Sequence, residues 1–238
     1  ELALLEKYTE KQQLLDAIAD ADAVIVRSDI VDEEVINAGK KLKIVVRAGA
    51  GYDNVDLEAA TRAGVCVMNT PGQNSNAVAE LVFGLLVYAV RNFYNGTSGT
   101  ELMGKKLGIH AYGNVGRNVA RIAKGFGMEV LAYDAYCRAE DIKQEGVNPT
   151  CSVKTLYQGC EIVSVHIPLT SETRQIINKE LLELLPANAV MVNTARKEVV
   201  NEADLLQHMI DNPKFKYVTD VAPDNQAEIK EKAGDRYF

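Results

Sequence analysis

The chain reads Leu107-Gly-Ile-His-Ala-Tyr-Gly-Asn-Val-Gly-Arg117 near its middle and then Val130-Leu-Ala-Tyr-Asp134. This pattern predicts a strand, a tight glycine turn, the start of a helix and a second strand that ends in an acid. Such a βαβ unit is typical of dinucleotide binding, because the amide groups at the helix N-terminus face the phosphates. Gly113 lets the backbone come close to a pyrophosphate, and Gly116 lets the helix pack on the strand. Ala111 stands where the usual glycine triplet begins.

The acid at the end of the second strand indicates which dinucleotide is bound. Asp134 lies 18 residues after Gly116, close to the separation of roughly 20 expected for the acid that holds the adenosine ribose hydroxyls. A carboxylate there repels a 2′-phosphate, so the sequence favours NAD over NADP. The alternative is a tight turn in an α/β protein that binds no nucleotide.

Short β-branched runs alternate with helical patterns along the whole chain. The expected strands are 23–27, 43–47, 65–69, 106–111, 129–134, 162–166, 190–193 and 217–220, and the expected helices include 11–21, 57–63, 115–126, 179–185 and 202–211. Alternation of this kind predicts parallel sheets covered by helices, and right-handed crossovers then give doubly wound folds. We therefore expect an α/β protein with two doubly wound parallel-sheet domains.

The segment 74–92 predicts a long helix that is apolar nearly all round, and such a helix must be buried. A polar stretch, Asn95-Gly-Thr-Ser-Gly99, follows it. We expect the domain boundary here, with one domain over 1–92 and the dinucleotide domain over 93–238. We also expect the chain to be a fragment, with its first residues inside a strand and with both domains incomplete.

Composition excludes several classes of protein. The net charge of −7 and the lack of a basic block argue against nucleic acid or an anionic membrane as a partner. The four cysteines lack metal-ligand spacing, so we expect no metal and reduced thiols in the cytoplasm. The longest apolar run, residues 81–90, is far short of the roughly 20 residues that span a bilayer.

Four more motifs lie at predicted strand ends, where ligands bind in open α/β sheets. The first is the turn Arg47-Ala-Gly-Ala-Gly51, which presents backbone amides and an arginine to an anion or is an ordinary turn. The others are His166-Ile-Pro-Leu-Thr170, Asn193-Thr-Ala-Arg196 and Val218-Thr-Asp-Val221.

Taken together, the motifs resemble the D-isomer-specific 2-hydroxyacid dehydrogenases, in particular the branch that oxidises D-3-phosphoglycerate. They occur in the family's order along essentially the whole chain, and include Asn69-Thr-Pro-Gly-Gln-Asn74, Val78-Ala-Glu80 and Gly99-Thr-Glu-Leu102. The resemblance implies a flavodoxin-like substrate domain, a Rossmann NAD-binding domain and a homodimer. It also implies NAD-linked hydride transfer between a 2-hydroxy acid and its 2-oxo acid, with 3-phosphoglycerate favoured and serine biosynthesis as the setting.

The resemblance also assigns roles by position. Arg196 is the expected catalytic residue, which holds the substrate carboxylate and polarises the reacting oxygen; the alternative is a salt bridge with Glu198 or Glu202. The substrate-binding positions are Arg47, Ala48, Gly49, Ala50, Gly51 and Asn74. The cofactor-binding positions are Thr70, Gly113, Asn114, Val115, Gly116, Asp134, His166, Ile167, Pro168, Thr194, Ala195 and Asp220.

The proton carrier of this chemistry is not found among those residues. The family uses a histidine, supported by a glutamate about five residues after the strand-end aspartate, and here Asn225 stands at that position with Glu228 beyond it. We expect His110 to be buried, His166 to lie on the cofactor side and His208 to be exposed. The carrier is therefore expected after Phe238, with a lysine of lowered pKa as a hypothesis.

Three readings remain open from the sequence. The first is the phosphoglycerate enzyme, and the second is a reductase of glyoxylate, hydroxypyruvate or another small 2-oxo acid. Lys197-Glu198, in place of a glycine pair, and a short 92–99 segment bear on this choice of substrate. The third is an NAD-sensing module that resembles the family's corepressors and turns over no substrate.

Overall fold

The computed structural model describes all residues, Glu1–Phe238, and the chain divides into two compact units, Glu1–Asn74 and Ser75–Phe238. Both are α/β units with parallel sheets, which confirms the predicted α/β class. No helix is both long and apolar enough to cross a membrane.

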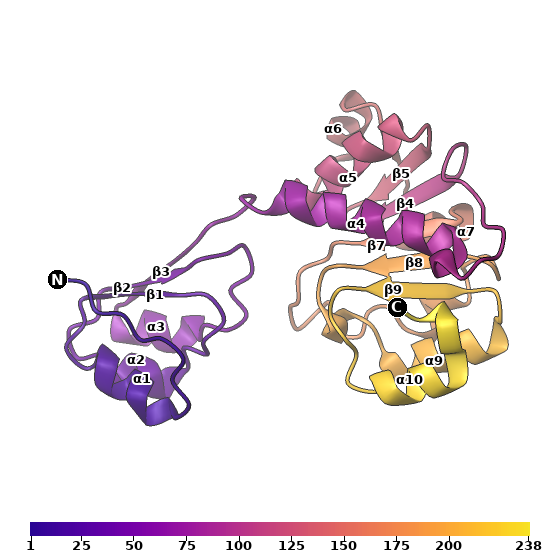
Figure 1. The fold of residues 1–238 in the computed structure, drawn as a ribbon. Helices are drawn as coiled ribbons and strands as arrows, with labels where there is room; N and C mark the ends of the chain where they lie inside the picture. Colours follow the sequence, from indigo (N-terminus) through magenta and orange to yellow (C-terminus); the bar gives the residue numbers. More distant parts are fainter. The chain divides into compact units, whose positions relative to one another are not determined.

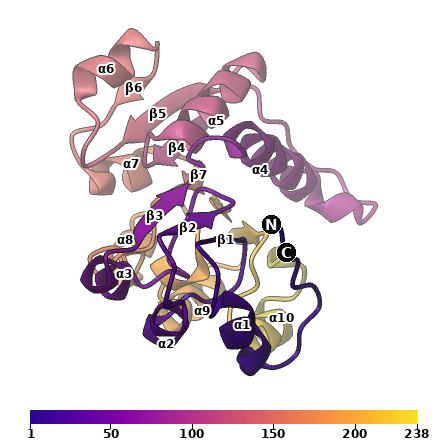
Figure 2. The same cartoon turned by 90° about the vertical axis from the view of Figure 1, so that its left-hand side faces the viewer.

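The first unit is a three-stranded parallel sheet with the order β1-β2-β3. Its elements are α1 (Lys11–Ile18), β1 (Ala23–Val26), α2 (Glu33–Ala38), β2 (Ile44–Arg47), α3 (Leu57–Ala63) and β3 (Cys66–Asn69). The helices all lie on the same side of the sheet (Figures 1 and 2). They pack on Val26 and Val45, whereas Ile25 on the opposite face is 73% exposed. Residues 1–7 form no strand, so the expectation of a strand there is wrong.

The second unit holds a six-stranded parallel sheet with the order β6-β5-β4-β7-β8-β9. Its strands are β4 (Lys106–His110), β5 (Glu129–Tyr133), β6 (Asn148–Pro149), β7 (Ile162–Val165), β8 (Val190–Asn193) and β9 (Lys216–Thr219). Counted along the chain this is the order 3-2-1-4-5-6 of the Rossmann fold, in which the strand order reverses between β4 and β7. Ligands bind at the carboxyl ends of the strands beside that reversal.

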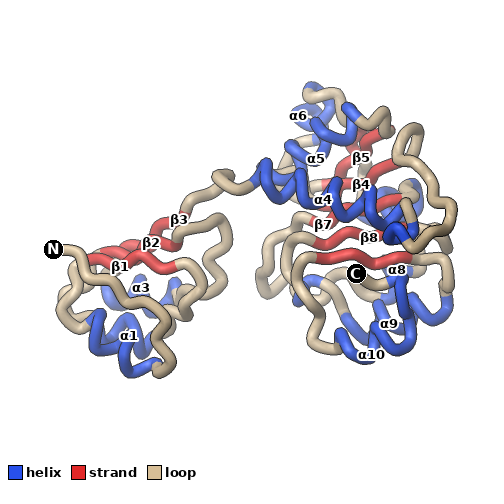
Figure 3. The backbone as a smooth tube through the Cα atoms, viewed as in Figure 1, coloured by secondary structure: helices blue, strands red, loops and turns tan.

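Helices cover both faces of this sheet (Figure 3). They are α4 (Ser75–Val90), α5 (Asn114–Gly125), α6 (Ala139–Gln144), α7 (Val153–Gly159), α8 (Lys179–Leu182), α9 (Glu202–Asp211) and α10 (Gln226–Ala233), with short 3-10 turns at Asn92–Tyr94, Lys197–Val199 and Gly234–Arg236. The buried side chains form two cores. One lies under α4, α5 and α6, and the other under α7, α8, α9 and α10.

The long apolar helix α4 belongs to the second unit. Val82 and Leu86 are fully buried in its core, and Phe83 stacks on Phe126 with the ring centroids 5.1 Å apart. The chain therefore divides between residues 74 and 75, 18 residues before the expected boundary at 92/93. The polar stretch 95–99, where the boundary was expected, is held to the end of α4, because the Asn92 side chain donates to the Ser98 carbonyl at 2.8 Å.

Candidate active site

The glycine turn after β4 has the geometry that a pyrophosphate requires. Gly113 is the N-cap of α5, so the first amide groups of this helix point outward at the carboxyl end of β4. A side chain at Gly113 would meet no other atom within 4 Å, which leaves open space where a ligand approaches. A side chain at Gly116 would instead collide with the Ala111 carbonyl oxygen, so close helix packing demands glycine there. Asn114 and Val115 are the first two residues of α5.

Ala111 occupies a conformation that usually takes glycine. Its φ is +82°, in the left-handed region that L residues other than glycine rarely adopt. The Ala111 amide donates to the Tyr133 carbonyl at 2.9 Å. The turn thus keeps the shape of the usual glycine triplet although its first glycine is absent.

Asp134 is fixed beside this turn by backbone donors. Its carboxylate accepts from the amides of Tyr112 at 2.7 Å, Tyr136 at 2.7 Å and Cys137 at 2.8 Å. These bonds tie the end of β5 to the glycine turn and hold the acid at the position expected for the ribose hydroxyls. The Tyr112 amide is a part of this arrangement that the sequence analysis did not identify.

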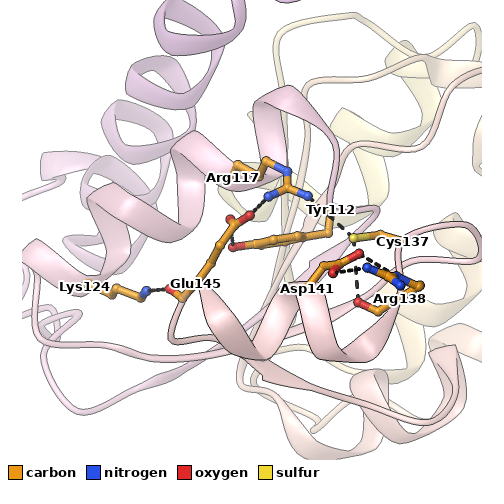
Figure 4. Close-up of polar contacts among 7 residues, drawn as sticks. All are labelled: Tyr112, Arg117, Lys124, Cys137, Arg138, Asp141 and Glu145. Carbon is orange, nitrogen blue, oxygen red and sulfur yellow. Dashed lines mark hydrogen bonds and ion pairs between the residues drawn. The ribbon is translucent and has the colours of Figure 1, made fainter.

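A network of side chains supports the loop that carries Asp134 (Figure 4). Arg117 of α5 forms an ion pair with Glu145 and lies over the Tyr112 ring, 5.0 Å from its centroid. It also donates to the Cys137 sulfur at 3.6 Å, and the Tyr112 hydroxyl donates to Glu145 at 3.0 Å. These contacts join segments far apart in sequence, so no local pattern could have revealed them.

Two histidines lie at the carboxyl ends of β4 and β7, and both have lowered pKa values. Burial lowers the pKa of His110 to about 4, and its Nδ1 lies 3.2 Å from the Tyr157 hydroxyl. Burial likewise lowers the pKa of His166 to about 3, and its Nε2 lies 2.8 Å from Ser164 Oγ. His110 is buried as predicted. Ile167 is also buried, whereas Pro168 is exposed in the loop that follows.

The turn after β8 is held by Asn193, which is not among the expected site residues. Asn193 is 1% exposed; its side-chain oxygen accepts from the Ala195 amide at 3.0 Å, and its amide donates to the Arg196 carbonyl at 3.0 Å. An asparagine at the end of a buried strand is a turn signal, so this role could have been predicted. Thr194 in the same turn has a buried hydroxyl with no hydrogen-bond partner.

Arg196 and Asp220 come together at the ends of β8 and β9. Burial raises the pKa of the Asp220 carboxyl, while the backbone and the positive charge of Arg196 act in the opposite direction. Arg196 is half-buried, and its guanidinium also donates to the Ala195 carbonyl at 3.0 Å. Glu202, one of the two expected salt-bridge partners, accepts from the amides of Asp224 at 2.9 Å and Asn225 at 3.0 Å.

The remaining expected residues belong to the first unit. The turn 48–51 follows β2 and is braced by Asn69, which donates to the Ala50 carbonyl at 2.7 Å. The Arg47 guanidinium lies over Gly49, so a side chain at that position would require the arginine to move, and the buried Nε of Arg47 has no hydrogen-bond partner. The Thr70 amide donates to the Gly49 carbonyl at 3.0 Å, and Asn74 ends the unit.

His208 is not where the sequence analysis expected it. It is buried at 6% exposure, and its ring packs edge-on against Phe215 with the centroids 4.7 Å apart. The prediction of an exposed His208 is therefore wrong, because the helix pattern did not show that α9 turns this position toward the core.

The donor set fits a dinucleotide. Outward amides at the start of α5, the open space at Gly113, the fixed carboxylate of Asp134 and the unpartnered Thr194 hydroxyl all lie at the carboxyl edge of one sheet. This is the edge where Rossmann folds bind their cofactor.

Comparison with known proteins agrees with this geometry. Residues 87–233 match the model of the D-isomer specific 2-hydroxyacid dehydrogenase NAD binding domain. The chain belongs to this family. Its cofactor is NAD.

Individual relatives carry two different names. The chain is 39% identical over 211 residues to D-3-phosphoglycerate dehydrogenase of Methanocaldococcus jannaschii, covering 83% of this chain but 40% of that protein. It is 37% identical over 224 residues to hydroxypyruvate reductase of Thermotoga maritima, covering 88% of this chain and 72% of that protein. The chain thus spans well under half the length of the first relative.

A solved structure also matches nearly the whole chain. The NAD+-bound 3-phosphoglycerate dehydrogenase of Entamoeba histolytica has a TM-score of 0.92 and 43% sequence identity, covering 98% of this chain and 75% of that chain. This similarity extends over both units of the present chain.

Proposed function

We propose that the protein catalyses the NAD-dependent oxidation of D-3-phosphoglycerate to 3-phosphohydroxypyruvate in serine biosynthesis. The observation that carries the substrate choice is the turn after β2, where the Arg47 guanidinium lies over Gly49 and its buried Nε has no partner. A substrate with both a carboxylate and a phosphate needs more cationic donors than Arg196 alone provides.

In this proposal the first unit, Glu1–Asn74, binds substrate and the second unit, Ser75–Phe238, binds NAD. Arg196 holds the substrate carboxylate and polarises the reacting oxygen, because its planar fork matches a carboxylate and it is charged at any working pH. Arg47, the turn 48–51 and Asn74 contact the other anionic group.

NAD, when bound, supplies the hydride acceptor. The α5 amides and Gly113 would hold its pyrophosphate, Asp134 its adenosine ribose and Asp220 its carboxamide. Thr70, His166, Ile167, Pro168, Thr194 and Ala195 complete the proposed contacts.

The oxidation also needs a group that accepts the hydroxyl proton. The His166 ring is hydrogen-bonded to Ser164 Oγ, and His110 and His208 are buried. The proposal therefore assigns this role to none of the three histidines. Glu228 is exposed and paired with Lys232 at 2.6 Å. Asn225, at the position of the family's glutamate, has a buried side-chain oxygen without a partner.

The Arg47→Ala variant of the full-length protein tests the substrate assignment. We expect its KM to rise much more for 3-phosphoglycerate than for D-glycerate, since only the phosphorylated substrate uses the extra cation. Equal changes in KM for both substrates would contradict the proposal that Arg47 binds the phosphate group. Asn74→Ala, a second variant in the first unit, is measured with the same two substrates.

A second candidate function is the reduction of hydroxypyruvate or glyoxylate. The match to the Thermotoga maritima hydroxypyruvate reductase, of which the chain covers 72%, favours it. The ratio of kcat/KM for 3-phosphohydroxypyruvate to that for hydroxypyruvate decides between them. A ratio well above one supports the phosphoglycerate enzyme, and a ratio below one supports the reductase.

We further propose a cytoplasmic homodimer with no partner beyond its small anionic substrate. Four free thiols support the location. Large exposed side chains on the second unit, Leu81 at 40%, Met103 at 65% and Phe126 at 40%, support a contact between copies. Sedimentation equilibrium tests the dimer, and a monomer at all concentrations would contradict it.

A further inference from the structure

A cavity lies at the edge of the large sheet opposite the proposed NAD site. It has a volume of about 340 Å³ and is formed where α4 ends beside the starts of β7, β8 and β9. Figure 3 shows the end of α4 at this edge, and the Lys216 ammonium confirms the contact by donating to the Ala89 carbonyl at 2.7 Å. Dinucleotides bind at the carboxyl ends of the strands, so this cavity at the amino ends is separate from the NAD site.

The cavity carries an excess of positive charge. Lys105, Lys214 and Lys216 line it together with one acid, Glu161. Lys105 neutralises Glu161 at 3.4 Å, and the same carboxylate accepts from the Lys106 amide at 3.2 Å. Lys214 and Lys216 have no carboxylate partner, and burial alone lowers the pKa of Lys216.

A helix cap explains only part of this arrangement. Lys216 donates to the Ala89 carbonyl and to Asn92 Oδ1, both at 2.7 Å, so it stabilises the negative end of α4. Neither contact involves Lys214, and neither explains why Ser98 and Asn188 face the same space. Both acceptors are neutral, and the ammonium also lies 5.4 Å from the centroid of the Phe93 ring, so no negatively charged group is paired with Lys216.

We propose that this cavity binds a small phosphate-bearing molecule, with Lys214 and Lys216 as its charged donors. Lysine ammonium groups bind phosphate as point charges, and hydroxyl and amide donors satisfy its remaining oxygens. The volume lies at the lower end of the range for small-molecule sites, which suits a compact metabolite.

Calorimetric titration with inorganic phosphate tests the site. The full chain is first saturated with NAD, so that the amides at the start of α5 are occupied. The variants are Lys214→Glu, which is exposed and disturbs no core contact, and Lys216→Gln, whose fold is checked by circular dichroism. Lys230→Glu and Lys230→Gln on α10 are the matched controls, because they make the same two charge changes away from the cavity.

We expect the Kd for phosphate to rise about tenfold in each cavity variant relative to its control, as for the loss of one charge-assisted hydrogen bond. Any phosphate bound at the turn after β2 contributes equally in the parent chain, the cavity variants and the controls, so it cancels in this comparison. A rise of less than about threefold in both variants, or no binding to the parent chain, would overturn the proposal.

Discussion

Replacing Asp134 by asparagine removes an acceptor on which the local fold and the cofactor site both depend. Three backbone amides point at the carboxylate, at 2.7, 2.7 and 2.8 Å. In the most favourable orientation of the new side-chain amide, its oxygen accepts from the backbone amides of Tyr136 and Cys137. Its NH2 group then faces the backbone amide of Tyr112. One hydrogen bond is then lost, and the other two become bonds to a neutral acceptor.

Bonds to charged groups contribute about 1.5–3 kcal/mol each and neutral bonds about 1 kcal/mol. The loss of one and the weakening of two predict a decrease of about 3 kcal/mol in the free energy of unfolding. Urea denaturation of the second unit, followed by circular dichroism, measures this decrease. We also expect the Kd for NAD to rise, and the preference for NAD over NADP to fall, in fluorescence titrations.

Asp141→Asn provides the matched control. Asp141 makes a two-pronged ion pair with Arg138, at 2.9 and 2.7 Å, on the exposed side of α6 (Figure 4). Exposed pairs contribute little to stability, so this variant is expected to denature like the parent chain. An Asp134→Asn protein with unchanged stability and unchanged NAD preference would refute the reasoning.

Three further predictions concern the glycine turn and the buried His110. Ala111→Gly relieves a positive φ that costs about 1–2 kcal/mol but adds backbone entropy of about 0.5–1 kcal/mol, so a small rise in melting temperature is expected. Gly116→Ala is expected to lower the melting temperature and weaken NADH binding in a fluorescence titration, because its side chain meets the Ala111 carbonyl. Since folding lowers the pKa of His110 to about 4, the unfolded chain binds its proton first as the pH falls, and stability decreases below about pH 6.5 and levels off near the folded value. The expected loss between pH 7 and pH 5 is about 2 kcal/mol for this histidine, and His110→Phe should make the pH dependence of the urea midpoint shallower. A Phe variant with the parent's pH dependence would contradict that cause.

The sequence was most informative where structure is local. Apart from the strand expected at residues 1–7, each predicted strand is present, because β-branched runs between turn signals have few alternatives to a buried parallel strand. β6 was missed because it has only two residues, Asn148–Pro149, and Pro149 has no amide to donate.

The position of the domain boundary could not be predicted in the same way. The apolar pattern of α4 shows that the helix is buried, but only tertiary packing on α5 and on the ends of β8 and β9 shows which unit buries it. The Arg117–Glu145 pair and the buried state of His208 likewise depend on contacts between distant segments. Site residues at strand ends were easier to identify, since topology alone brings such ends to one edge.

The most direct test of the proposed activity is NADH formation by the full-length protein with 3-phosphoglycerate, alongside D-lactate, D-glycerate and a blank without substrate. Selective turnover of 3-phosphoglycerate is the predicted result. Binding of NAD without turnover of any hydroxy acid, in either direction, would contradict the assignment as an enzyme and favour an NAD-sensing role.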